Sequence, residues 1–453
     1  MKRHLIFGRF GTGDVDHIAN GDGEQSTPLP FVVANRRIEH DITDALDALA
    51  KLGVYPSERA VDLLVLAAHV QATDTHISRD TESQDGWTRE LRIVVPVSDP
   101  VLWTASIPVL QRLLNFLTGD RWTVGFRARP QGFEQIALVP PAKLIPPPFD
   151  CLTLFSGGLD SLIGSIDFLE RGKTPLLVSH AGDGTVSQSQ KFLYDSLNKH
   201  YPKSNFDRLR VWMDFRGWSV AGVTPDKKTR GRSFLFFSAG VFAGSGFGDP
   251  FTLYAPENGL IALNVPLDPL RLGSFSTRTT HPFYIARWNE LLQVVGINGR
   301  IENPYWNRTK GEMVRECANP ALIASLASKS FSCASPNKSR WKKGAPAAEH
   351  CGFCLPCLIR RASLRGADQT PYTLDDLSAG ELDTTKAEGQ QVRSFQFAIN
   401  RIRENPSLAR LLIHKPGPLS DESAARQDAL ADVYLRGLAE LDAVLAGVRT
   451  GPA

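Results

Sequence analysis

The sequence of 453 residues contains no apolar run long enough to cross a membrane as a helix. Its longest apolar stretch, from about Phe234 to Phe247, is interrupted by glycines and is shorter than the ~20 residues that a membrane-spanning helix needs. The first residues, Met1 to Gly8, have a basic tip but lack the apolar centre of a secretory signal. We therefore predict a cytoplasmic protein that is not bound to a membrane.

The net charge is small, and the sequence contains few cysteines. The formal net charge of +3 does not by itself indicate a nucleic-acid-binding protein, so nucleic acid stays undecided as a partner. Only six cysteines occur, and the clustering of four of them favours metal binding in a reducing compartment over a disulfide framework. The composition is that of a soluble globular protein, and the length indicates roughly two to four domains.

One stretch stands out among what is present. An apolar run that ends at Phe155 leads directly into a short polar turn, after which a helical pattern begins. The turn consists of Ser156, Gly157, Gly158, Leu159, Asp160 and Ser161. A strand that turns through two glycines into a helix gathers backbone N–H groups beside the positive end of the helix dipole, which predicts an anion site.

The side chains of this turn suit a phosphate ligand. The two glycines let a phosphate approach the backbone, and the two serines can add hydroxyl donors. Asp160 can cap the helix or hold Mg²⁺ near the phosphates. An ordinary strand-turn-helix connection is the alternative interpretation.

We expect four regions along the chain. Residues 1–148 are predicted to form an N-terminal α+β accessory domain, which ends in a proline-rich linker. In residues 149–330 strands alternate with helices, which predicts a doubly wound parallel sheet with ligands at the carboxyl ends of its strands. Residues 331–370 carry the clustered cysteines. Residues 371–453 are predicted to be helical, as a scaffold or an oligomer surface.

Two stretches of the second region, one at the end of a predicted strand and one at the start of a predicted helix, contain residues that could contact ATP. His180, followed by Ala181 and Gly182, ends the second predicted strand, where adenine is expected to dock. A basic segment from Lys227 through Lys228 and Arg230 precedes a helix that begins near Arg232. We favour Arg232 as a contact for the triphosphate, while a solvated loop is the alternative.

Further along lie candidates for a substrate loop and a second phosphate contact. The substrate-loop candidates are Glu257, Asn258, Arg278 and His281, the last two at the end of a polar run that starts at Arg271. A capped, hydrated turn explains that run equally well. Thr309 and Glu312 form a predicted capping box, and Lys310 between them is best explained by an anion at this helix start.

The four clustered cysteines are Cys333, Cys351, Cys354 and Cys357. Thiolates at this spacing converge on one ion, which predicts a structural four-cysteine zinc site, although a [4Fe–4S] cluster can use the same triplet. The basic and aromatic residues from Lys338 to Lys343 could contact RNA or an acidic partner, or form a solvated loop. His69, Asp74 and His76 are expected to be core or surface residues and not a metal site.

These motifs and their order resemble a known family. The turn at Ser156 resembles the PP-loop of the N-type ATP pyrophosphatases, whose fold is of the adenine-nucleotide α-hydrolase type. With Arg232, the Thr309-Lys310 pair and the four cysteines, the region from Cys151 to Arg361 resembles the QueC family of 7-cyano-7-deazaguanine synthases. Ser233 replaces an asparagine of that family, and its Tyr-Pro-Asp-Cys-Arg substrate segment is missing. In its place stand Glu257-Asn258-Gly259 and the run from Ser274 to Pro282. Together with the extra N-terminal domain, these segments resemble QatC, the QueC-like component of Qat anti-phage defence systems.

The resemblance implies an ATP-dependent C–N ligase with Mg²⁺ and structural zinc. It would adenylate a 7-deazaguanine carboxylic acid and pass the acyl group to ammonia or to an amine of a partner protein. Asp160, Lys310 and Arg232 would act on ATP. A tRNA-thiolating PP-loop enzyme and a nucleotide-sensing subunit of a defence complex are the two alternatives, and an oligomer or complex is expected.

Overall fold

The computed structural model describes residues 2–32, 37–142, 146–180, 184–226, 228–248, 250–268, 278–335 and 349–452. Several residues named above therefore lie outside the described part: Ala181, Gly182, Lys227, Arg271, Ser274 and the basic segment 338–343. No helix within the described residues is long and apolar enough to cross a membrane.

The N-terminal region is built on a sheet of four parallel strands in the order β2-β1-β3-β4. The strands are β1 (Arg3–Phe10), β2 (Glu24–Val32), β3 (Glu90–Val97) and β4 (Arg121–Ala128). The expectation of an α+β domain was wrong, because helices connect β2 to β3 and β3 to β4, and such crossovers make neighbouring strands parallel. The helices are α1 (Ile42–Lys51), α2 (Glu58–His76), α3 (Arg79–Glu82), α4 (Pro100–Ala105) and α5 (Ile107–Thr118).

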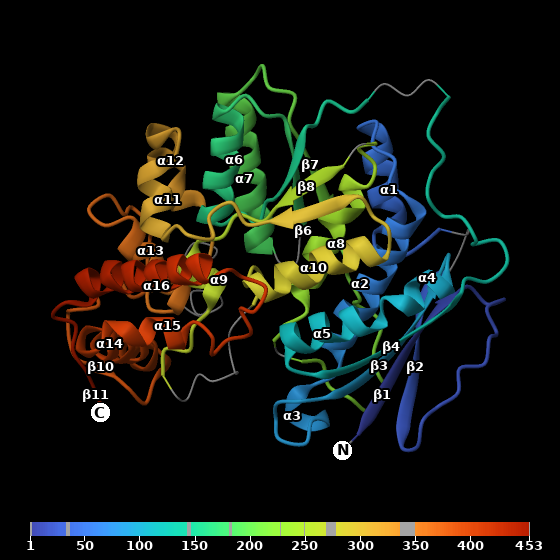
Figure 1. Ribbon diagram of the computed structural model, residues 1–453, viewed down its shortest axis with the longest axis horizontal. Coiled ribbons are helices and arrows are strands. Elements are labelled where there is room, and N and C mark those ends of the chain that lie inside the picture. Colours follow the sequence, from blue (N-terminus) through green and yellow to red (C-terminus); the bar gives the residue numbers. More distant parts are fainter. Residues whose placement is uncertain are drawn as a thin grey trace.

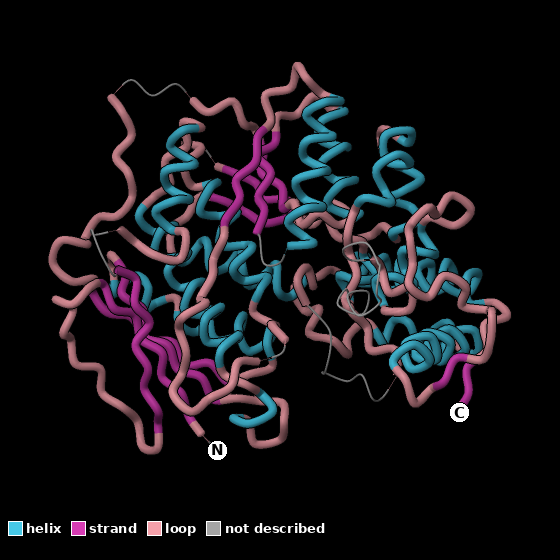
Figure 2. Tube along the Cα trace, turned by 180° about the vertical axis from the view of Figure 1, so that it is seen from behind, coloured by secondary structure: helices cyan, strands magenta, loops and turns pink. Residues whose placement is uncertain are grey.

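The second sheet has five parallel strands in the order β7-β6-β5-β8-β9 (Figures 1 and 2). They are β5 (Cys151–Leu154), β6 (Pro175–His180), β7 (Asp207–Val211), β8 (Phe251–Tyr254) and β9 (Gly299–Glu302). The chain runs outward from β5 to β7 and then returns to β8 on the other side of β5. This confirms the predicted doubly wound sheet and puts the reversal of strand order between β5 and β8, where such folds bind ligands.

Helices cover both faces of this sheet. Its helices are α6 (Leu159–Glu170), α7 (Gly184–His200), α8 (Arg232–Gly244), α9 (Gly259–Leu263) and α10 (Pro282–Val294). Leu152 and Leu154 of β5 pack in the core that holds α8 and α10, whereas Phe155 packs in the core that holds α6 and α7. Successive side chains of a strand point to opposite faces, so two separate cores form.

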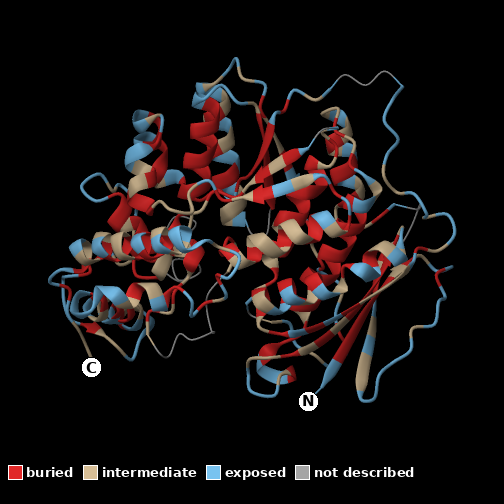
Figure 3. Ribbon diagram, in the orientation of Figure 1, coloured by how far each residue is buried: buried red, intermediate tan, exposed pale blue. Residues whose placement is uncertain are grey.

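The N-terminal region and the α8 face of the second sheet share one hydrophobic core. Buried residues of α2, among them Leu63 and Val70, belong to the same cluster as Phe234 and Phe237 of α8. Helices α2 and α8 pack directly against each other. Figure 3 shows this buried interior running through both regions. The proline-rich segment before residue 149 therefore does not mark a boundary in the packing.

The remaining chain forms a helical region with its own core. Its helices are α13 (Leu355–Ser363), α14 (Ala387–Glu404), α15 (Ala409–Leu412) and α16 (Ala424–Leu445), with the 3-10 turn η4 (Pro406–Leu408). The preceding helices α11 (Lys310–Glu316) and α12 (Pro320–Leu326) and the 3-10 turn η2 (Ala327–Lys329) pack instead in the core that holds α6 and α7. Two short strands, β10 (Leu382–Asp383) and β11 (Thr450–Gly451), pair in parallel. The predicted helical C-terminus is confirmed.

Candidate phosphate-binding and metal sites

The turn from Ser156 to Ser161 joins β5 to α6, as predicted. Gly157 has φ +82°, a left-handed conformation that favours glycine. A Cβ on Gly157 would also lie 3.0 Å from Cγ of Gln190. Gly158 precedes α6 without a side-chain cap. The start of α6 therefore carries backbone N–H groups with no capping side chain, in the arrangement that binds phosphates.

Neighbouring segments fix the backbone of this turn. The backbone N–H of Phe331 donates to the carbonyl of Gly157 at 2.8 Å, and the hydroxyl of Ser189 donates to the same carbonyl at 3.1 Å. The hydroxyls of Ser156 and Ser161 lie 3.1 Å apart and hydrogen-bond to each other. Ser156 is exposed while the other residues of the turn are buried. The turn is therefore held in a fixed shape with one serine hydroxyl accessible from outside.

Asp160 forms a buried ion pair with Lys310. Nζ of Lys310 lies 3.0 Å from Oδ1 of Asp160, and the two side chains are 3% and 12% exposed. The other oxygen, Oδ2, accepts hydrogen bonds from the side chain of Asn258 at 2.7 Å and from its backbone N–H at 3.1 Å. Asp160 does not cap α6, one of the two roles expected for it. It instead ties together the segments that follow β5, β8 and β9.

Lys310 is the first residue of α11, and its neighbours form the predicted capping box. The N–H of Glu312 donates to the hydroxyl of Thr309 at 3.1 Å, and the N–H of Thr309 donates to the carboxylate of Glu312 at 2.9 Å. The capping box is confirmed. It fixes the direction of the helix start and leaves the Lys310 side chain to extend toward Asp160.

Glu257 lies beside this ion pair at the carboxyl end of β8. The amide of Asn303 holds its backbone on both sides, donating to its carbonyl at 2.7 Å and accepting from its N–H at 3.3 Å. The hydroxyl of Thr280 donates to its carboxylate. Burial raises the pKa of Glu257 to about 7, and the negative charge of Asp160 adds to the shift. Glu257 is therefore a carboxyl group that changes charge near neutral pH.

The other two substrate-loop candidates contact α5. The guanidinium group of Arg278 donates a hydrogen bond to the carbonyl of Phe116 at 2.7 Å and stacks over the ring of Phe116. Nδ1 of His281 accepts from the N–H of Phe283 at 3.2 Å and so caps α10. Burial lowers the pKa of His281 to about 3, which keeps the ring neutral. The structure gives His281 the role of a helix cap.

His180 and Arg232 lie near each other at the carboxyl end of β6. Burial lowers the pKa of His180 to about 4, and the charge of Arg232 lowers it further. Neither ring nitrogen of His180 makes a hydrogen bond of ordinary geometry within the described residues. Arg232 begins α8, as the sequence predicts. A neutral imidazole beside a cation suits a site where a purine or phosphate docks.

An aspartate of the N-terminal region holds the segment before Arg232. Oδ2 of Asp74 accepts from the hydroxyl of Thr229 at 2.8 Å and from the backbone N–H groups of Arg230 at 2.7 Å and Gly231 at 2.8 Å. Sequence reasoning missed this role and placed Asp74 only in the core or on the surface. The available signal was a carboxylate within a long apolar helix, since a buried charge needs partners.

The four cysteines converge at the start of α13. Their sulfur atoms all lie within 4.8 Å of one another, and the Cys333–Cys354 and Cys351–Cys357 pairs are 3.9 Å apart. A zinc ion bound to four thiolates at ~2.3 Å holds its sulfurs at about this spacing. Backbone N–H groups of Cys351 and Ser335 donate to the sulfur of Cys333 at 3.3 and 3.4 Å, which stabilises a thiolate. This group can hold a metal ion.

The segment that carries the four cysteines is attached to the turn from Ser156 to Ser161 (the phosphate turn). Phe331, which bonds to Gly157, lies two residues before Cys333. The buried guanidinium of Arg360 on α13 donates to the hydroxyls of Ser330 at 3.0 Å and Thr370 at 2.9 Å. An ion held by the cysteines would therefore also stiffen the segment from Ser330 to Cys333 that supports Gly157.

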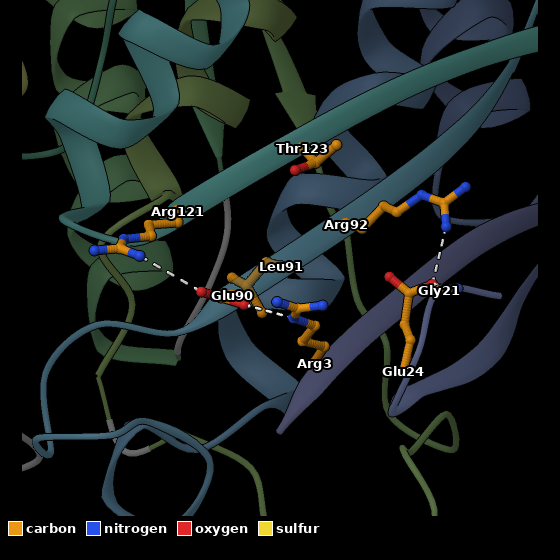
Figure 4. Close-up of a pocket in the computed structure, with 8 residues that line it drawn as sticks. All are labelled: Arg3, Gly21, Glu24, Glu90, Leu91, Arg92, Arg121 and Thr123. Atoms are coloured by element: carbon orange, nitrogen blue, oxygen red, sulfur yellow. Dashed lines mark hydrogen bonds and ion pairs between the residues drawn. The ribbon is translucent and has the colours of Figure 1, made fainter. Parts of the chain in front are cut away.

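A separate hollow of about 380 Å³ lies on the N-terminal sheet (Figure 4). Arg3 pairs with Glu90 at 2.8 Å and Arg92 pairs with Glu24 at 2.9 Å. Its charges are thus largely neutralised within the chain, and it shares no residue with the site around Asp160.

No protein-family model matches the sequence, and a comparison with curated proteins finds none with significant similarity.

Proposed function

We propose that the chain is a QueC-like, ATP-dependent enzyme that adenylates a 7-deazaguanine carboxylic acid and transfers the acyl group to an amine. The observation that carries the proposal is the Asp160–Lys310 ion pair, which joins the Gly157-Gly158 turn to the segment after β9. A dinucleotide-binding turn does not require a buried lysine at this position. A site that cleaves a triphosphate gains from one, because negative charge develops on the departing pyrophosphate.

In the proposed first step, an oxygen of the substrate carboxylate attacks the α-phosphorus of ATP. An O–P bond forms, the bond to the β-phosphate oxygen breaks, and pyrophosphate leaves with the negative charge. The N–H groups at the start of α6 and the ammonium of Lys310 stabilise this charge, and Arg232 at the start of α8 is the further proposed contact. Mg²⁺, when bound with ATP, supplies further charge neutralisation at the phosphate oxygens.

In the second step, an amine attacks the carbonyl carbon of the acyl-adenylate and AMP leaves, which forms an amide. The attacking nitrogen must lose a proton. Glu257, which changes charge near neutral pH and lies beside the Asp160–Lys310 pair, is suited to accept it. The cysteines would hold structural zinc, because a four-thiolate shell leaves no position for substrate.

The direct test measures pyrophosphate release from ATP in the presence of 7-carboxy-7-deazaguanine. Asp160→Asn removes the charge that orients Lys310, and Ser156→Ala removes the exposed hydroxyl of the turn. We expect each variant to slow release roughly 100-fold, the effect of losing one preorganised contact. Asp150→Asn is the matched control. Asp150 lies just before β5, at the end of that strand opposite to the turn, and forms an exposed ion pair with Lys173.

Two outcomes would reject the proposal. Undiminished release by both site variants would remove the turn from the mechanism, and ATP binding without release for every deazapurine acid would favour a nucleotide-sensing subunit. The acceptor is identified by intact-mass measurement of partner proteins after the reaction. A partner that gains the acyl mass indicates a protein amine, whereas unchanged partners with a free primary amide, or the nitrile that a second ATP-dependent dehydration of it gives, indicate ammonia.

A further inference from the structure

The C-terminal helix α16 contacts the helix start that carries Lys310. The hydroxyl of Thr309 donates to Oε1 of Glu440 at 2.7 Å, and the backbone N–H of Gly311 donates to Oε2 of Glu440 at 3.2 Å. One carboxylate of α16 therefore bonds to the residues on both sides of Lys310. In Figure 1, α16 lies next to α11, although more than a hundred residues separate them in the chain.

The chain makes room for this carboxylate. A Cβ at position 311 would lie 2.3 Å from Oε1 of Glu440, so only glycine permits the approach. The hydroxyl of Thr309 already accepts the N–H of Glu312 in the capping box, and donating to Glu440 completes its hydrogen bonding. Glu440 also places a negative charge at the positive end of α11.

A second contact lies one helical turn earlier on α16. Arg436 donates to the carbonyl of Asn307 at 3.0 Å and bonds to the carboxylate of Glu312. Arg436 therefore holds the two ends of the segment 307–312, and Glu440 holds Thr309 and Gly311 within it. Lys310 extends from the middle of this segment to Asp160, where its ammonium meets the phosphate turn.

We propose that Glu440 is a positioning residue that holds the Thr309–Gly311 turn so that Lys310 reaches the phosphate turn, which makes the C-terminal helix part of the active site. The inference rests on the proposed function. Its physical basis is the steep dependence of catalysis on geometry, since a misplacement of ~1 Å can cost about 100-fold in rate. Lys310 has a long flexible side chain, so the position of its backbone decides where the ammonium can go.

Glu440 does not also have to hold α16 in place. Buried side chains of α16, including Leu430, Val433, Leu438 and Leu441, pack in the core of the helical region. A variant at Glu440 therefore keeps this packing. An effect of such a variant on the reaction can then be separated from unfolding.

The test compares Glu440→Gln with wild-type protein for pyrophosphate release at varied ATP. Glutamine keeps the size of the side chain, but its NH₂ group faces a donor of the turn and cannot accept from it. We expect kcat to fall roughly 10- to 100-fold while the melting temperature changes little and the KM for ATP changes less than kcat. Gly311→Ala should give a similar loss, and the double variant should lose little more, since both changes disturb one contact. Asp442→Asn, on the same helix in an exposed pair with Arg403, is the control.

Wild-type kcat in Glu440→Gln would overturn the inference while the proposed function stands. A loss of kcat that is matched by an equal loss of folded protein would also overturn it, because the role would then be structural. If wild-type protein releases no pyrophosphate with any deazapurine acid, the proposed function fails and the inference falls with it.

Discussion

The carboxylate of Asp74 accepts a hydrogen bond from the backbone N–H of Gly231 at 2.8 Å and thereby joins the N-terminal region to the start of α8. The same carboxylate pairs with Arg79 and Arg89, each at 2.7 Å, and both arginines also pair with Asp120 at 2.6 Å. All four side chains are buried. The segment that leads to Arg232 is therefore attached to a buried charge network of the N-terminal region.

Replacing Asp74 with asparagine should destabilise the protein by ~3 kcal/mol at pH 7, because two buried arginines lose a partner. Burial alone would raise the pKa of Asp74, but the charges of Arg89 and Arg79 outweigh it and hold the pKa below its usual value of 3.8. The charged form thus adds stability above pH 3.8, and this contribution is lost as the pH falls further. Urea unfolding at pH 7 and pH 3 checks both statements. An equal difference from wild type at the two pH values would contradict the network.

The cysteine cluster predicts about one zinc ion per chain in elemental analysis and a colourless protein. Cys354→Ser should abolish metal binding and lower the melting temperature, because the ion links Cys333 to α13. Cys317→Ser is the control, since Cys317 is buried in a different core and is not one of the four clustered cysteines. Visible absorption together with stoichiometric iron would instead indicate an iron–sulfur cluster at the four cysteines.

Glu257 should make stability depend on pH in an unusual direction. Its pKa is about 7 in the folded chain and 4.5 ordinarily, so between these values the folded state binds more protons than the unfolded state. The free energy of unfolding therefore falls as the pH rises through this window. Glu257→Gln does not titrate and should gain stability relative to wild type between pH 5 and pH 8. Urea unfolding at both pH values tests this, with Glu404→Gln at the exposed end of α14 as the control.

Gly157→Ala should lose stability and pyrophosphate release together. The left-handed conformation costs ~1–2 kcal/mol for alanine, and the added methyl group meets Gln190. Gly172→Ala is matched to it, because Gly172 has φ +72° but no atom within 4 Å of the added Cβ. Gly172→Ala should show the loss of stability alone. Full pyrophosphate release by Gly157→Ala would show that the turn tolerates a side chain where a phosphate is proposed to bind.

The central sheet, the capping box and the cysteine cluster could be predicted because each depends on local patterns. Buried parallel strands are continuous apolar runs, a capping box is a spacing of three residues, and cysteine clusters are visible in the chain itself. The N-terminal sheet was different. An α+β domain was expected there, but the strands are parallel, and the direction of strands follows from their connections and not from the local sequence pattern.

The missed contacts join residues far apart in the chain. Asp74 bonds to Gly231 across 157 residues, and Glu440 bonds to Thr309 across 131. On α16, Arg436 and Glu440 have the spacing of an ordinary exposed ion pair within one helix. Only packing shows that both side chains turn toward another segment instead of toward each other.

The core shared by α2 and α8 makes residues 1–148 and the second sheet a single cooperative unit. A chain cut by protease in the proline-rich segment should stay associated and melt in one transition, since the apolar contacts between the two pieces survive the cut. A fragment that starts at residue 149 should instead aggregate, because it would expose the α8 surface that α2 covers. The N-terminal region in this sense supplies part of the hydrophobic core of the second sheet and is not an attachment to it.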